Sequence, residues 1–266
     1  MAEKPAFQFL PPENAPSPGE RAEAARREQL PLWPPEPLIS FLGWLFLSIA
    51  LASLLRLGVE TFFKAENKAA SGTLGTLSGT LAFHLLVLGG IFRALRSARL
   101  SWSQAFGDWR RRFGRTTLLG CLLGVFLIGV NIPLMLLVRT TLESLSVPVH
   151  VQEAIQIVQT APSLSAKIAI GFMAVLAAPV MEELLFRGVL YAGLRDAGHP
   201  QKALWGSAIL FALSHSNTLT FLPLTVFGVI QALAFERFRN LWPCIAAHAL
   251  FNLFNFTMAL QAASGS

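Results

Sequence analysis

Two glutamates and an arginine lie in an otherwise apolar stretch of the chain, at Glu182, Glu183 and Arg187. Insertion scales assign a charged side chain at the centre of a bilayer a cost of about 2.5–3.5 kcal/mol, so residues of this kind usually face a cavity or a partner and indicate a functional site. Glu183 and Arg187 are four residues apart and share one helix face, where they can pair. Glu182 is turned away by about 100° and needs a different partner.

Three more polar side chains follow in later apolar segments: His215, His248 and Asn252. The four-residue spacing recurs there, between Phe211 and His215 and between His248 and Asn252. Residues at this spacing lie on one face of a helix. We therefore predict that the polar faces of three helices converge on one internal cavity, lined by Glu182, His215, His248 and Asn252.

A carboxylate beside two imidazoles can activate water for attack on a peptide bond. The glutamate would act as general base, while the imidazoles and the amide donate hydrogen bonds to the oxyanion. Alternatively, Glu182, His215 and His248 could bind zinc or another divalent metal that polarises water. The sequence leaves both mechanisms, with and without a metal, open. Pro179, one turn before Glu182, is expected to free a backbone carbonyl and to bend the helix.

Other peptidase patterns are missing or weak. The chain has no His-Glu-x-x-His sequence, and its two aspartates, Asp108 and Asp196, fall outside the clear apolar runs, which excludes a two-aspartate intramembrane protease. Ser78, between Gly75 and Gly79, fits a helix-packing surface better than a nucleophile. We assign His84 and the two cysteines to packing as well.

The composition predicts the elements that must position these residues. Of 266 residues, 53% are hydrophobic and 14% are charged, whereas soluble domains carry about 25% charged residues. We predict an all-α, polytopic membrane bundle of seven transmembrane helices around the polar cavity, with an eighth if residues 140–160 enter the bilayer. The seven apolar runs are 38–58, 73–92, 117–138, 165–190, 203–216, 219–235 and 241–260.

Three parts follow along the chain. Residues 1–37 are expected to form a disordered cytoplasmic tail, residues 38–160 accessory transmembrane helices, and residues 161–262 the catalytic core. The loop 93–116 holds seven arginines and one aspartate, which favours a cytoplasmic position and contact with anionic lipids. We therefore expect a multi-pass protein of the cell membrane with a cytoplasmic N-terminus, and no nucleic-acid partner.

Taken in order, the three motifs resemble those of the CAAX-processing endopeptidase and bacteriocin-processing (CPBP) family of intramembrane proteases, the Ras-converting-enzyme-like or ABI family. The resemblance covers about residues 165–260 and implies a helical membrane fold with a conical cavity. It also implies roles for single residues: Glu182 as catalytic base, Glu183, Arg187 and Phe211 as support, His215 and His248 orienting water or metal, and His248 with Asn252 stabilising the oxyanion.

The function predicted from this resemblance is intramembrane hydrolysis of a peptide bond, near the C-terminus of a lipidated or membrane-associated peptide. The partner would be a peptide or protein substrate within or at the membrane. One alternative is a non-catalytic membrane scaffold or a peptide-transport or immunity accessory protein. A proton-coupled transporter is a weaker alternative, because the two halves of the chain show no internal repeat.

Overall fold

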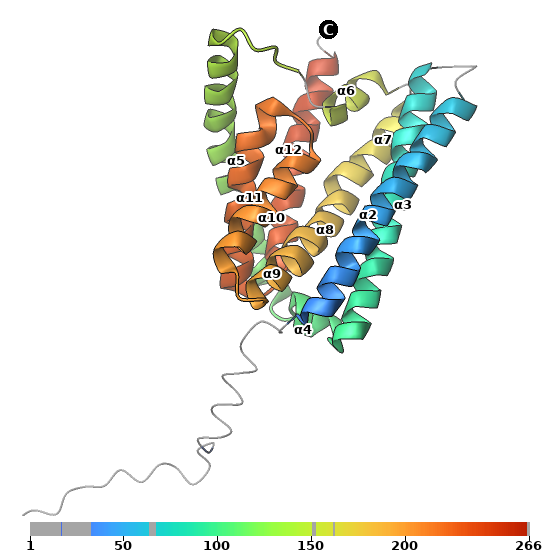
Figure 1. Cartoon of the computed structure of the whole chain (residues 1–266). Coiled ribbons are helices and arrows are strands. Elements are labelled where there is room, and N and C mark those ends of the chain that lie inside the picture. The colour runs from blue at the N-terminus through green and yellow to red at the C-terminus, as the bar shows by residue number, and fades with distance from the viewer. Residues whose placement is uncertain (1–16, 18–32, 64–67, 151–152, 162, 265–266) are drawn as a thin grey trace, which may run out of the picture.

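The computed structural model describes residue 17 and residues 33–63, 68–150, 153–161 and 163–264, and within these ranges the chain is helical with no strand (Figure 1). With η marking π-helix, the helices are α2 (Pro35–Phe62), α3 (Lys68–Ala98), α4 (Trp102–Phe106), α5 (Phe113–Ser144), α6 (Glu153–Thr160), α7 (Leu164–Phe172), η1 (Met173–Ala177), α8 (Ala178–Glu183), η2 (Leu184–Tyr191), α9 (Ala192–Asp196), α10 (Pro200–Ser214), α11 (Thr218–Phe238) and α12 (Trp242–Ser264).

Among the described residues, six helical stretches are long and apolar enough to cross a membrane. The predicted all-α, multi-pass membrane bundle is therefore confirmed, although the number of such stretches is below the seven or eight expected. The six are Pro35–Phe62, Ser71–Ala98, Phe113–Ser144, Leu164–Asp196, Thr218–Phe238 and Trp242–Ala262.

The one predicted span that is missing from these six, 203–216, is helical but short. Its helix α10 has 15 residues and is therefore about 22 Å long, less than the ~30 Å of the hydrocarbon core. The helix ends because Ser216 adopts a left-handed φ of 48° and Asn217 caps the next helix. The segment 140–160, which we considered as an eighth span, contains the end of α5 and the eight-residue α6.

Most of the predicted tail, namely 1–16 and 18–32, lies outside the described residues. Helix α2 begins at Pro35, inside the range we had assigned to the tail. Proline suits the first position of a helix because its missing N–H would have no partner there. Just before it, the Trp33 side chain is buried, and its backbone N–H donates to Asp196 Oδ2 at 3.2 Å.

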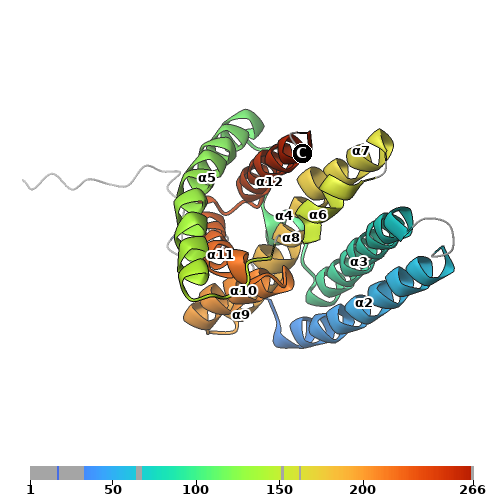
Figure 2. The same ribbon diagram turned by 90° about the horizontal axis from the view of Figure 1, so that it is seen from above.

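Helices α2 and α3 form an antiparallel pair on one flank of the molecule, while α5, α11 and α12 pack together on the other (Figures 1 and 2). Glycines let α2 and α3 approach closely: a Cβ on Gly79 would lie 2.9 Å from Arg56 Cβ. Ser78 Oγ donates to Gly75 O at 3.0 Å, as a packing residue does. The composite helix α7–α9 runs between the two flanks, with α8 contacting both α3 and α12.

The Arg-rich segment and two later turns share one end of the bundle. Leu241 N donates to Phe106 O at 2.9 Å, and Asn240 Nδ2 donates to Asp108 O at 3.0 Å. Arg195 Nη1 bonds Glu236 Oε2 at 3.0 Å at the same end. The Arg-rich segment therefore lies beside the turn that follows α11, and the turn that follows α9 lies at the same end.

Candidate active site

The helix that carries the glutamates departs from α-helical geometry on both sides of them, in η1 and η2. In η1, Ala178 N–H donates to Met173 O, five residues back. The same spacing would pair residue 179 with Ala174 O, but Pro179 has no N–H to donate. Asn252 of α12 supplies the missing donor, since its Nδ2 lies 2.8 Å from Ala174 O. The carbonyl that we expected Pro179 to free is therefore bound by a residue of the third motif.

Glu183 and Arg187 form the ion pair that their spacing predicts. Arg187 Nη1 lies 2.9 Å from Glu183 Oε1, and the two residues are 1% and 0% exposed. The guanidinium also donates to Gly228 O at 3.4 Å and lies over the Phe211 ring, 4.7 Å from its centroid. The arginine is thus balanced by a carboxylate, a carbonyl and an aromatic face, which a buried cation requires.

His248 connects the two glutamates. Its Nδ1 lies 2.7 Å from Glu183 Oε1, and its Nε2 lies 3.6 Å from Glu182 Oε2. An ionised carboxylate accepts hydrogen bonds and donates none, so Nδ1 carries the proton in the contact with Glu183. Glu183 thereby sets the orientation of the imidazole and directs its second nitrogen toward Glu182, much as a buried carboxylate orients the histidine of a catalytic triad.

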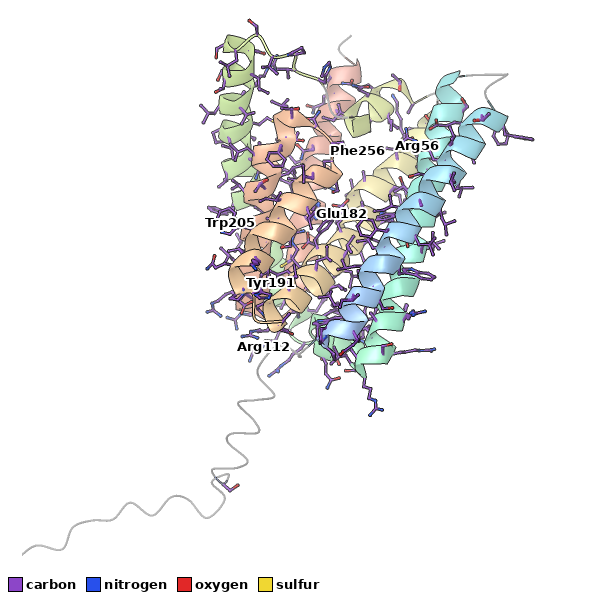
Figure 3. The ribbon with its side chains drawn as sticks, in the orientation of Figure 1. Arg56, Arg112, Glu182, Tyr191, Trp205 and Phe256 are labelled. Atoms are coloured by element: carbon purple, nitrogen blue, oxygen red, sulfur yellow. The ribbon has the colours of Figure 1, made fainter. Side chains whose placement is uncertain are left out.

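Glu182 and Glu183 occupy very different surroundings although they are adjacent. Oε1 of Glu183 accepts hydrogen bonds from Arg187, His248 and Gln231. The Glu182 side chain is 24% exposed, and its Oε2 has no hydrogen-bond partner among the described residues. Figure 3 places Glu182 near mid-height of the bundle, away from both ends. Oε2 of Glu183 also has no such partner, but Glu183 is 0% exposed, so Glu182 is the more accessible of the two carboxylates.

His215 lies beside this group without joining it directly. It follows α10, its Nδ1 is 2.9 Å from Phe211 O, and its ring packs edge-on against Phe211 at 4.9 Å. The other neighbours of the Phe211 ring include His248, at 5.8 Å, and the guanidinium of Arg187. Phe211 is fully buried and its ring contacts both histidines, so this ring links His215 to His248.

The predicted metal ligands are not assembled. Within the described part of the chain, no group of three His, Cys, Asp or Glu side chains is placed to hold a metal ion. Glu182 and His248 approach one another, whereas His215 contacts the ring and the carbonyl oxygen of Phe211. This arrangement does not fit the three-ligand site that we considered.

One buried polar residue at the site escaped the sequence analysis. Gln231 of α11 is 0% exposed, and its Nε2 lies 3.3 Å from Glu183 Oε1 and 2.9 Å from Cys244 O. A glutamine inside the apolar run 219–235 indicates a buried polar contact, but the prediction considered ionisable residues in these runs. Cys121 and Cys244 are free thiols, in agreement with a packing role.

Comparison with known proteins covers the segment that holds this site. Residues 164–254 match the family described as type II CAAX prenyl endopeptidase Rce1-like. The Bacillus subtilis (strain 168) protein named "Putative membrane peptidase YdiL" is 28% identical over 83 residues, which are 31% of this chain and 34% of that protein. No solved structure matches the chain at a comparable level. The resemblance predicted from the three motifs is thus confirmed: over residues 164–254, this multi-pass membrane protein is similar to the Rce1-like family of type II CAAX prenyl endopeptidases.

Proposed function

We propose that this protein is an intramembrane endopeptidase that hydrolyses a peptide bond with water activated by Glu182. The observation that carries the proposal is the asymmetry of the two glutamates. Glu183 is buried, pairs with Arg187 and fixes His248 through its Oε1, whereas the partly exposed Glu182 offers an unpaired oxygen 3.6 Å from His248 Nε2. The match to a peptidase family over 164–254 supports this assignment.

In the proposed reaction, a water molecule held between Glu182 Oε2 and His248 Nε2 attacks the peptide carbonyl. Glu182 takes one proton from the water as the new C–O bond forms, which gives a tetrahedral oxyanion. The same proton then passes to the peptide nitrogen as the C–N bond breaks, leaving a carboxylic acid and an amine. The acid then gives its proton to the amine. Atoms and charge balance with water as the one co-substrate.

The other motif residues take supporting parts in this proposal. An amide NH₂ has two hydrogens, so Asn252 can bind Ala174 O with one and donate to the oxyanion with the other. Arg187 pairs with Glu183, the residue that orients His248. His215 acts through Phe211, so we expect its loss to be milder than the loss of His248.

Water activation without a metal is the form that the side-chain arrangement favours, because His215 does not join Glu182 and His248. The test is turnover of purified protein before and after chelation, with the metal content measured in each sample. Activity that persists in metal-free protein agrees with the proposal. Activity that is lost on chelation and restored by zinc would refute the metal-free mechanism in favour of a zinc-dependent one.

We further propose that the substrate is a lipidated or membrane-associated peptide cut near its C-terminus, since Glu182 lies at mid-height of a membrane bundle. The experiment compares the protein termini in membranes from cells that carry wild-type protein or Glu182→Gln. Termini present only with wild type would identify the substrate. Identical termini, with both proteins inserted at equal levels, would favour the scaffold alternative.

The end of the bundle that carries the Arg-rich segment is proposed to face the cytoplasm and anionic lipids. Exposed arginines there stand beside an aromatic cluster in which the Phe113 and Trp242 rings are 5.2 Å apart. Aromatic rings at the interface and arginines on the inner side are typical of membrane anchoring. The arginines are Arg110, Arg111, Arg112 and Arg115.

A further inference from the structure

His84 lies on the buried face of α3, outside the matched segment 164–254. It is 7% exposed and starts a stripe that continues with Val87 and Ile91, both buried in the main core. Helix α3 contacts α8, which carries the two glutamates, and η2, which follows it. The stripe of α3 that includes His84 therefore points to the interior of the bundle rather than to lipid.

His84 Nδ1 and Glu182 Oε2 are buried and have no hydrogen-bond partner among the described residues, which is also true of Glu183 Oε2. Burying a polar atom without a partner is unfavourable, and an apolar side chain of similar size would avoid the penalty. The charge on Glu182 also acts on His84 across the contact between α3 and α8. A polar group held between His84 and Glu182 would give a partner to His84 Nδ1 and to Glu182 Oε2 at once.

We propose that His84 is a positioning residue of the hydrolytic site, which donates from Nδ1 toward the Glu182 carboxylate and the water that it activates. The proposal rests on the proposed function and extends it, because it assigns part of the site to α3. The helices that we had treated as accessory would then complete the site, and separating α3 from α8 would disable it.

The variants His84→Leu, His84→Asn and His84→Gln separate this role from packing. Leucine keeps the apolar volume and removes the unpaired atom, asparagine places an amide near the position of Nδ1, and glutamine places one near Nε2. We expect kcat of His84→Leu to fall on the order of 100-fold, with a melting temperature equal to or above that of wild type. His84→Asn should keep kcat within about tenfold of wild type, and His84→Gln should resemble His84→Leu.

Val87→Ala is the matched control, because Val87 is buried on the same stripe one turn away. It should lower the melting temperature by opening a cavity while kcat stays close to wild type. Wild-type kcat in His84→Leu would overturn the proposal. So would a loss of kcat that accompanies a lower melting temperature and is not restored by asparagine.

Nitrogen NMR of the His84 imidazole provides a readout that does not depend on turnover. We expect its signal to change when Glu182 is replaced by glutamine, and an unchanged signal would overturn the proposal. Turnover retained in Glu182→Gln would instead refute the proposed function itself. If Glu182→Gln is inactive while His84→Leu keeps full activity, only the role of His84 is refuted and the proposed function stands.

Discussion

Glu183→Gln should destabilise the protein strongly, because Glu183 neutralises a buried cation. Its Oε1 lies 2.9 Å from Arg187 Nη1 and 2.7 Å from His248 Nδ1, and both Glu183 and Arg187 are at most 1% exposed. Removing one partner of a buried ion pair costs about 3–5 kcal/mol, since the other charge stays buried without compensation. For a chain of this size, about 2–4 °C per kcal/mol gives a fall in melting temperature of about 6–20 °C.

The assay is thermal unfolding of the purified protein in detergent, with Glu182→Gln as the matched control. Glu182 is 24% exposed at its side chain, and its contact with His248 Nε2 is long, at 3.6 Å. We therefore expect this control to change stability by less than about 1 kcal/mol. The double variant Glu183→Gln/Arg187→Met removes both charges and should recover much of the lost stability.

Two results would refute this reasoning. If Glu183→Gln unfolds at the wild-type temperature, the buried pair does not hold the helix as its geometry implies. If Glu182→Gln is the more damaging of the two, the division into one structural and one reactive glutamate is wrong.

Three further perturbations test other parts of the account. Asn252→Ala should lower the stability by about 1–3 kcal/mol, because it leaves a buried carbonyl without a donor. Adding Pro179→Ala should restore part of that stability by supplying an N–H, and a double variant no more stable than Asn252→Ala would contradict the link between Pro179 and Asn252. His215→Ala should retain more turnover than His248→Ala, because only His248 contacts both glutamates; the reverse order in peptide-cleavage rates would argue against it. Gly79→Leu should separate α2 from α3, since even a Cβ would lie 2.9 Å from a neighbouring side chain; an unchanged melting temperature would show that the close approach is unnecessary.

Local patterns explain what could be predicted from the sequence. Helix positions follow from uninterrupted apolar runs, and the Glu183–Arg187 pair follows from helical spacing alone. The approach of His248 to the glutamates needed a further step, namely the assumption that rare polar residues in separate spans converge. That assumption holds for Glu182, Glu183 and His248, and it holds for His215 only through the ring of Phe211.

The remaining features depend on contacts between distant segments. The length of α10 is set by the left-handed Ser216 and the cap at Asn217, which hydropathy does not register. Gln231 and His84 are single polar residues in apolar runs, and nothing nearby in the sequence indicates which helix each one faces. The partner of the carbonyl freed by Pro179 lies 78 residues away from that carbonyl, on α12.

The turnover of Glu182→Gln in reconstituted membranes is the most direct test of the central claim. Glutamine preserves the size of the side chain and removes its ability to accept a proton from water. The account predicts that peptide cleavage falls by about 10²–10⁴-fold, the usual contribution of a general base, while insertion and melting temperature stay close to wild type. Cleavage within about tenfold of wild type would show that Glu182 is not the base.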